Sequence, residues 1–134
     1  MNKLDTAEME KGFGDIVQHV IYRVSKKNHD AMLQLCREAN EMFRENGGLH
    51  YEVFQLSHTN APMEGFINIA NIVSAAQDEE VWVESLYYRD SQHMNEVVAK
   101  MEKHERCNES YKQSLDLLPS GTSFIIGEFS RLNV

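Results

Sequence analysis

Three side chains that can transfer a proton lie in two strand-like stretches of the sequence. His50 and Glu52 alternate along one stretch and therefore project from the same side of a strand. Glu84 lies in the middle of the most apolar stretch of the chain, Val81–Tyr88. If the two strands are neighbours and their registers agree, the three side chains converge, and carboxyl groups in a partly apolar pocket can act as general acid or base. We take Glu84, His50 and Glu52 as candidate catalytic residues.

Two other roles are open to the same three side chains. Carboxylates together with a histidine can bind a divalent metal. Glutamates can also form hydrogen bonds or ion pairs at a subunit interface, where they are structural. The sequence contains neither a His-x-Glu motif with Cys-x-x-Cys nor a His-Glu-x-x-His motif. We therefore predict no bound metal and no cofactor.

Aromatic side chains close to these residues in sequence can line a pocket for a small apolar or aromatic substrate. Trp82, Tyr87 and Phe54 belong to the same two stretches. His19 and Arg23 share one side of an earlier strand-like stretch, where the arginine fork can bind an anionic group. The alternative for this pair is a solvent-exposed strand end. We assign all five side chains to a candidate substrate pocket.

The other histidines and cysteines fit structural roles. Solvated or capping histidines are expected at His29, His58, His93 and His104. Cys36 lies within the apolar stripe of a predicted helix, which is typical of a packed core thiol because reactive cysteines need partial exposure and positive surroundings. No nucleophile elbow, phosphate-binding loop or dinucleotide fingerprint is present. No motif therefore demands catalysis.

Composition narrows the class of protein. The chain has 134 residues, enough for one domain, and a formal net charge of -8. An acidic chain without a basic patch is a poor binder of nucleic acid or of an anionic membrane surface. No apolar run reaches the roughly 20 residues that a membrane-spanning helix needs. Residues 1–15 are polar and read as an N-terminal tail rather than a secretory signal, and two cysteines in such a chain indicate free thiols and a cytoplasmic protein.

Hydrophobic periodicity predicts four strands and two long helices. The expected strands cover residues 16–24, 49–57, 81–88 and 123–131. The expected long helices are residues 28–46, ended by Gly47 and Gly48, and a helix capped by Ser91 that ends near Lys103 and His104. Ser25 or Asn28 can cap the first of these helices. Short helices are predicted within residues 66–76 and 107–118.

The order strand–helix–strand, repeated once, predicts an α+β fold of the ferredoxin-like βαββαβ type, a single domain over residues 16–134. Right-handed crossovers place both long helices on one face of a four-stranded antiparallel sheet, with the stretch Val81–Tyr88 as a central strand. Apolar residues lie on both sides of the strands, so the uncovered face is an apolar patch. We predict a homodimer in which two such faces pack together and close a dimeric α/β barrel.

Three segments of the chain resemble the YbaA-like family of bacterial proteins. They are the segment Ile16 to Phe54, the strand Glu80 to Tyr88 followed by Ser91, and the tail from Leu118-Pro119-Ser120-Gly121 to Gly127-Glu128-Phe129. That family is similar in fold to the dimeric α/β-barrel superfamily, which includes cofactor-independent monooxygenases, haem-degrading enzymes, isomerases and stress-induced proteins. The resemblance implies the barrel and the dimer, and it implies no catalytic residue.

Two functional classes follow from these observations. The first is a stress-related or housekeeping module that binds a small molecule without converting it. The second is a cofactor-independent enzyme, monooxygenase-like or isomerase-like, that acts on a small apolar or aromatic substrate between the sheet and the helices. In that enzyme Glu84 or His50 serves as the base, and Trp82, Tyr87 and Phe54 line the pocket.

Overall fold

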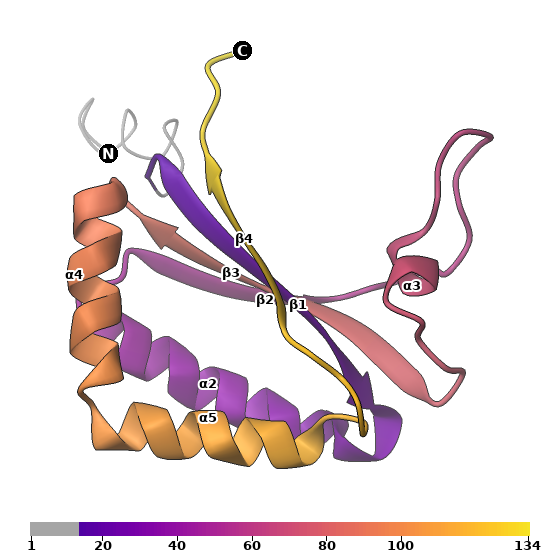
Figure 1. The fold of residues 1–134 in the computed structure, drawn as a ribbon, viewed down its shortest axis with the longest axis horizontal. Helices are drawn as coiled ribbons and strands as arrows, with labels where there is room; N and C mark the ends of the chain where they lie inside the picture. Colours follow the sequence, from indigo (N-terminus) through magenta and orange to yellow (C-terminus); the bar gives the residue numbers. More distant parts are fainter. Residues whose placement is uncertain (1–13) are drawn as a thin grey trace, which may run out of the picture.

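The computed structural model describes residues 14–134, so the N-terminal tail expected over residues 1–15 lies, up to residue 13, outside the described residues. The described elements, in chain order, are β1 (Ile16–Ser25), the 3₁₀ turn η1 (Lys26–Asn28), α2 (His29–Glu45), β2 (His50–Gln55), α3 (Ile69–Ile72), β3 (Glu79–Tyr88), α4 (Ser91–Glu102), α5 (Glu105–Leu117) and β4 (Ile125–Ser130). The strands form one antiparallel sheet in the order β2-β3-β1-β4. This is the ferredoxin-like α+β fold that the sequence predicts (Figure 1).

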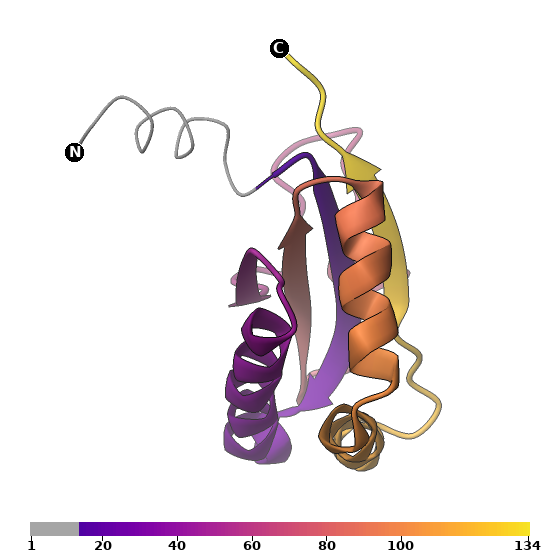
Figure 2. The ribbon, with the colours of Figure 1, turned by 90° about the vertical axis from the view of Figure 1, so that its left-hand side faces the viewer.

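Strand β3 is central, as predicted, because it pairs with β1 on one side and β2 on the other. Its pairing with β1 runs from Ile16 opposite Tyr88 to Ser25 opposite Glu79. Cross-strand partners project from the same face of a sheet, so Tyr22 and its partner Trp82 lie on one face. The three longer helices cover that face, which we call the helix face, and the opposite face is called the open face (Figures 1 and 2).

Helix α2 packs on the helix face through the apolar stripe that its sequence predicts. Met32, Cys36 and Phe43 are buried along this stripe. The helix ends where Gly47 adopts a φ of +99°, a conformation that glycine adopts without strain. A Cβ atom at Gly48 would lie 2.2 Å from the ring of Phe43, so a side chain here would displace this core residue.

The core lies between α2, α4 and the sheet. Its most buried large side chains are Tyr22, Tyr88, Phe43, Val24 and Val97. The rings of Phe43 and Tyr88 meet edge to face, with centroids 5.3 Å apart and planes 82° apart. Such aromatic pairs add stabilisation beyond the apolar area that they bury.

The start of helix α4 differs from the sequence prediction in two ways. Asp90 caps the helix, not Ser91, because the Asp90 carboxylate accepts a hydrogen bond from the backbone N–H of His93 at 2.8 Å. His93 was expected to be solvated or capping, and it is instead buried. Its Nδ1 accepts from the N–H of Arg89 at 3.0 Å, so its Nε2 donates to the carbonyl of Gly47 at 2.7 Å. His93 thereby ties the start of α4 to the end of α2.

Residues 56–78 form an arm that borders the open face. The predicted short helix is present as one turn, α3, and Asn68 caps it by accepting a hydrogen bond from Ala70 N at 2.9 Å. The Asn68 amide also donates to the carbonyls of His58 and Asn60 and so closes the arm on itself. Exposed apolar side chains on this arm are Met63, Phe66, Ile67 and Ile72. Between residues 14 and 134 no helix combines the length and the hydropathy needed to cross a bilayer.

Candidate functional site

The sheet register separates the three candidate catalytic residues. His50 lies opposite Tyr87 and Glu52 lies opposite Ser85, whereas Glu84 lies opposite Val53. Glu84 is therefore on the helix face, while His50 and Glu52 are on the open face. The predicted convergence of the three side chains is wrong. It required Glu84 to lie opposite an even-numbered residue of β2, such as Glu52, but Glu84 lies opposite Val53. A shift of one residue in the pairing moves a side chain to the other face of the sheet.

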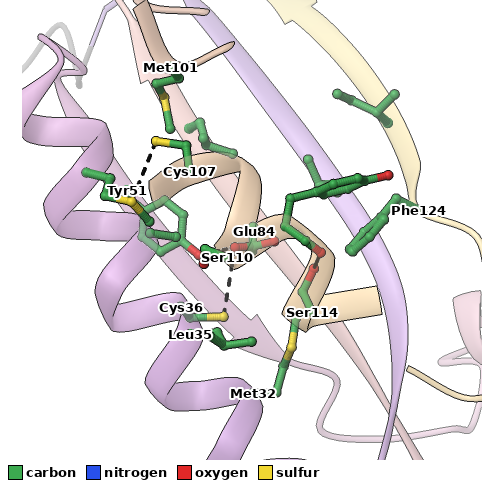
Figure 3. A pocket seen from close by; sticks show the side chains of 16 residues that line it. Met32, Leu35, Cys36, Tyr51, Glu84, Met101, Cys107, Ser110, Ser114 and Phe124 are labelled. Carbon is green, nitrogen blue, oxygen red and sulfur yellow. Dashed lines mark hydrogen bonds between the residues drawn. The ribbon is translucent and has the colours of Figure 1, made fainter. Parts of the chain in front are cut away.

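Glu84 faces a cavity of about 380 Å³ between the sheet and helices α2 and α5. This volume lies at the small end of the range typical of ligand pockets. The walls are mostly aliphatic, aromatic and thioether side chains (Figure 3). The lining residues are Val20, Met32, Leu35, Cys36, Ala39, Met42, Tyr51, Glu84, Leu86, Met101, Cys107, Ser110, Tyr111, Ser114, Phe124 and Ile126.

Glu84 and three polar side chains around it form a cluster at the sheet side of the cavity. The hydroxyl of Tyr51 donates a hydrogen bond to Glu84 Oε1, and the thiol of Cys36 approaches the same oxygen at 3.8 Å. The Tyr22 hydroxyl lies 3.5 Å from the Cys36 sulfur. These residues come from β1, α2, β2 and β3, so the fold as a whole assembles the cluster. Figure 3 shows three of its members, Cys36, Tyr51 and Glu84.

Burial sets the protonation of this cluster. Burial raises the pKa of the Glu84 carboxyl above its ordinary value, and this effect prevails over the hydrogen bonds from Tyr51, Tyr22 and Cys36, which lower the pKa. Burial, and then the proximity of Glu84, also raises the pKa of both tyrosines and raises the pKa of Cys36 to about 11. The two hydroxyls and the thiol therefore remain protonated donors near neutral pH. Part of the Glu84 side chain remains accessible, because it borders the cavity.

The tyrosines and the thiol of this cluster were missed as site residues, although the sequence contains a signal for them. Glu84 shares its side of the strand with Trp82, Leu86 and Tyr88, all large and apolar. Tyr51 lies on the apolar side of its own stretch. Matching the two apolar sides places Glu84 beside Tyr51 instead of beside Glu52.

The five residues assigned to a substrate pocket do not come together around the Glu84 cavity. Trp82 is buried near the start of α2. Its Nε1 donates a hydrogen bond to Glu80 at 3.0 Å, and the centroid of its ring lies 5.2 Å from that of the His29 ring. Arg23 forms an ion pair with Glu79 at 3.0 Å. The other three residues, His19, Phe54 and Tyr87, line a shallow hollow on the open face.

Polar groups on the open face pair with one another. Glu52 accepts hydrogen bonds from His50 Nε2 at 2.8 Å and from the Tyr87 hydroxyl at 3.5 Å. His19 Nδ1 lies 2.8 Å from the hydroxyl of Ser85. Within residues 14–134, no three histidine, cysteine, aspartate or glutamate side chains are grouped so that they could hold a metal ion. The open face thus presents paired polar groups in a shallow apolar surface.

Comparisons with known proteins identify a family and a solved structure of similar fold. The model of a family described as "Protein of unknown function (DUF1428)" matches residues 16–117. None of the curated proteins matches the chain. Among solved structures, Rv0793 from Mycobacterium tuberculosis is similar with a TM-score of 0.50 and 16% identity over 88% of this chain and 97% of that chain. This similarity supports the ferredoxin-like architecture.

Two further structures are similar over most of their length at lower scores. An ethyl tert-butyl ether d (ethd) family protein from Bacillus halodurans C-125 has a TM-score of 0.43 and 12% identity, covering 84% of this chain and 96% of that chain. The de novo designed protein Foldit4 has a TM-score of 0.47 and 12% identity, covering 88% of this chain and 99% of that chain.

Proposed function

The chain belongs to the DUF1428 family of proteins of unknown function, and we propose that it binds a small, largely apolar molecule in the cavity between its sheet and helices α2 and α5. The observation that carries this proposal is a partly enclosed cavity with apolar walls and a single carboxyl group, Glu84. Ligand sites commonly combine apolar walls with a few polar groups that fix the orientation of the ligand.

A fluorescent probe with a filled-cavity variant tests this proposal. N-phenyl-1-naphthylamine is neutral and becomes brighter in apolar surroundings. Ala39 lines the cavity from α2, so Ala39→Phe places a ring in the ligand space. Ala31 is exposed on the same helix, and Ala31→Phe is the matched control.

We expect the wild type and Ala31→Phe to bind the probe with equal affinity and Ala39→Phe to bind it at least tenfold more weakly. Circular dichroism checks that both variants are folded. Equal binding by all three proteins would place the probe outside the cavity and would contradict the proposal. No binding by the wild type would contradict it as well.

A second candidate function is a cofactor-independent enzyme of the isomerase-like or monooxygenase-like kind. The observation that favours it is Glu84, a carboxyl whose pKa is raised by burial next to a cavity, which is how general acids and bases are often prepared. His50 lies on the other face of the sheet, so Glu84 alone is assigned the role of acid or base at the cavity.

Exchange of the methyl protons of 2-acetylnaphthalene in D₂O tests the isomerase-like form of this function. If Glu84 removes a proton next to the carbonyl and returns a deuteron, NMR shows loss of the methyl signal faster with wild type than with Glu84→Gln. Equal rates with the two proteins would argue against an enzyme of this kind and in favour of a binding module.

We further propose that the open face is covered by a second copy of the chain, which gives the dimeric α/β barrel implied by the YbaA-like resemblance. Phe54, Ile125 and Phe129 are about half exposed on this face. Large apolar patches of this kind usually mark interfaces. Two sheets pack stably face to face, and an identical face satisfies two-fold symmetry without needing another partner.

A further inference from the structure

We propose that the molecule held in the cavity is neutral and carries a carbonyl oxygen that accepts a hydrogen bond from the Glu84 carboxyl group. This inference rests on the proposed binding function and names the chemical class of its ligand. It follows from the charges, the hydrogen bonds and the size of the cavity.

The charges that line the cavity exclude an anionic ligand. Glu84 is the only acidic side chain in the lining, and the lining contains no lysine, arginine or histidine. A carboxylate or phosphate placed here would lose its water without gaining a cation. Burying an unpaired charge in this way is strongly unfavourable.

The number of acceptors disfavours a cationic ligand. An ammonium group has three donors that must find acceptors once its water is removed. Glu84 Oε1 already receives the Tyr51 hydroxyl and the Cys36 thiol, and the hydroxyl of Ser114 already donates to the Tyr111 carbonyl at 2.6 Å. An ion pair would also require an ionised Glu84, and the cost of burying two charges often exceeds their attraction.

The hydrogen bonds around Glu84 favour an acceptor on the ligand. Both hydrogen bonds from Tyr51 and Cys36 end on Oε1, so the proton of a neutral Glu84 belongs on Oε2. A buried carboxylic acid needs an acceptor for this proton. The Tyr22 hydroxyl also hydrogen-bonds to Glu84 and lies 3.5 Å from the Cys36 sulfur, but it does not line the cavity, so an acceptor on the cavity side is supplied by the ligand. A carbonyl oxygen brings an acceptor into the cavity without adding a donor or a charge.

The titratable groups that face Glu84 from the neighbouring elements keep their protons near neutral pH. They are Tyr22 from β1, Cys36 from α2 and Tyr51 from β2, and burial raises the pKa of each. From α4, α5 and β4, the cavity receives uncharged side chains: Met101, Cys107, Ser110, Tyr111, Ser114 and Ile126. Glu84 is thus the group whose ionisation controls ligand binding over the range in which the others stay protonated.

Four naphthalene probes of one size test the assignment. They are 2-acetylnaphthalene with a carbonyl, 2-ethylnaphthalene with no polar group, 2-naphthoate with a negative charge and 1-(2-naphthyl)ethylamine with a positive charge. Their affinities are measured at pH 6 by tryptophan or ligand fluorescence with the wild type, Glu84→Gln and Glu84→Leu. Glutamine keeps a hydrogen-bond donor and has no ionisable proton, whereas leucine removes the donor.

We expect 2-acetylnaphthalene to bind about tenfold more tightly than the other three probes, the gain typical of one buried hydrogen bond. Glu84→Leu removes this preference, and Glu84→Gln keeps it. Because burial raises the pKa of Glu84, the affinity of the wild type for the ketone falls with rising pH once Glu84 loses its proton, while the affinity of Glu84→Gln does not change with pH.

The outcomes separate this inference from the proposed function. Equal affinity for the ethyl and acetyl probes, or tighter binding of the amine, overturns the carbonyl assignment and leaves the binding function in place. If none of the four probes binds, the proposed binding function fails and the inference fails with it. If Glu84→Leu does not fold, the pH dependence of the wild type compared with Glu84→Gln decides the question.

Discussion

Two glutamates on neighbouring strands have opposite surroundings. Glu84 on β3 lies on the helix face, where it borders a cavity and receives the Tyr51 hydroxyl and the Cys36 thiol. Glu52 on β2 lies on the open face, where it pairs with His50 and 28% of its side chain is exposed. The two side chains belong to paired strands, and the parity of the register alone decides which face each one joins. The comparison shows that the same residue type becomes a buried acid on one face and a partly exposed member of a hydrogen-bonded pair on the other.

Two adjacent tyrosines on β3 also lie on opposite faces of the sheet, one buried and one on the open face. Their replacement gives the largest expected difference in stability. Tyr88 is 1% exposed, packs on Phe43 and donates to Gln18 at 2.6 Å, whereas Tyr87 lies on the open face. We expect Tyr88→Ala to lower the free energy of unfolding by about 3–5 kcal/mol, the usual cost of removing a buried aromatic ring. Tyr87→Ala should cost about 1 kcal/mol.

Urea unfolding of both variants measures the two costs. The measurement is made with Phe129→Asp also present, so that the proposed dimer contributes to neither value. Similar losses for Tyr87→Ala and Tyr88→Ala would show that the two faces contribute equally to the stability of the single chain, and the comparison would fail.

A charge placed on the open face has the next largest expected effect, on the stability of the proposed dimer. Phe129 is 53% exposed on this face, so Phe129→Asp puts a carboxylate into the proposed dimer contact. We expect the dimer to dissociate at least 30 times more readily, equivalent to about 2 kcal/mol or more. Leu115→Asp, at a 44% exposed position on α5, is the control and should leave the dimer unchanged. Sedimentation velocity over a range of concentrations measures both, and a wild type that is monomeric throughout would contradict the dimer.

The pH dependence of stability also distinguishes the two glutamates, by an amount that builds up gradually with pH. Because burial raises the pKa of Glu84 above its ordinary value of 4.5, the folded state keeps a proton that the unfolded state has lost. The free energy of unfolding must therefore fall as the pH rises above 4.5, by up to about 1.4 kcal/mol per pH unit, until Glu84 ionises in the folded state.

Glu84→Gln should remove this fall, and Glu52→Gln should keep it. Urea unfolding at pH 5, 6, 7 and 8 provides the slopes for the wild type and both variants. A slope that survives in Glu84→Gln and disappears in Glu52→Gln would assign the buried acid to the wrong face.

The sequence predicts the elements well because each one depends on local signals. The apolar stripe of α2 and the glycines after it indicate the helix and its end, and the order of strands and helices indicates the fold. The cap of α4 was predicted one residue late because Ser91 and Asp90 are both good caps, and only the structure shows which side chain reaches the His93 amide. His93 was misjudged because its acceptor, the Gly47 carbonyl, lies 46 residues away.

The candidate site was harder to predict because it depends on how distant segments pair. Alternation along each strand gives two possible faces, and nothing local states which face of one strand meets which face of the next. Glu84 was singled out because a carboxyl is unusual in so apolar a stretch. Its partners Tyr22, Cys36 and Tyr51 look like ordinary core residues in sequence, and three separate elements must pack before they surround it.

The position of a bound ketone tests the central claim most directly. Met32, Met42 and Met101 line the cavity, whereas Met63 lies exposed on the arm that borders the open face. In protein labelled with ¹³C at its methionine methyl groups, addition of 2-acetylnaphthalene should shift the signals of Met32, Met42 and Met101 and leave that of Met63 unchanged. A shift confined to Met63, or no shift at any of the four, would contradict the assignment of ligand binding to the helix face.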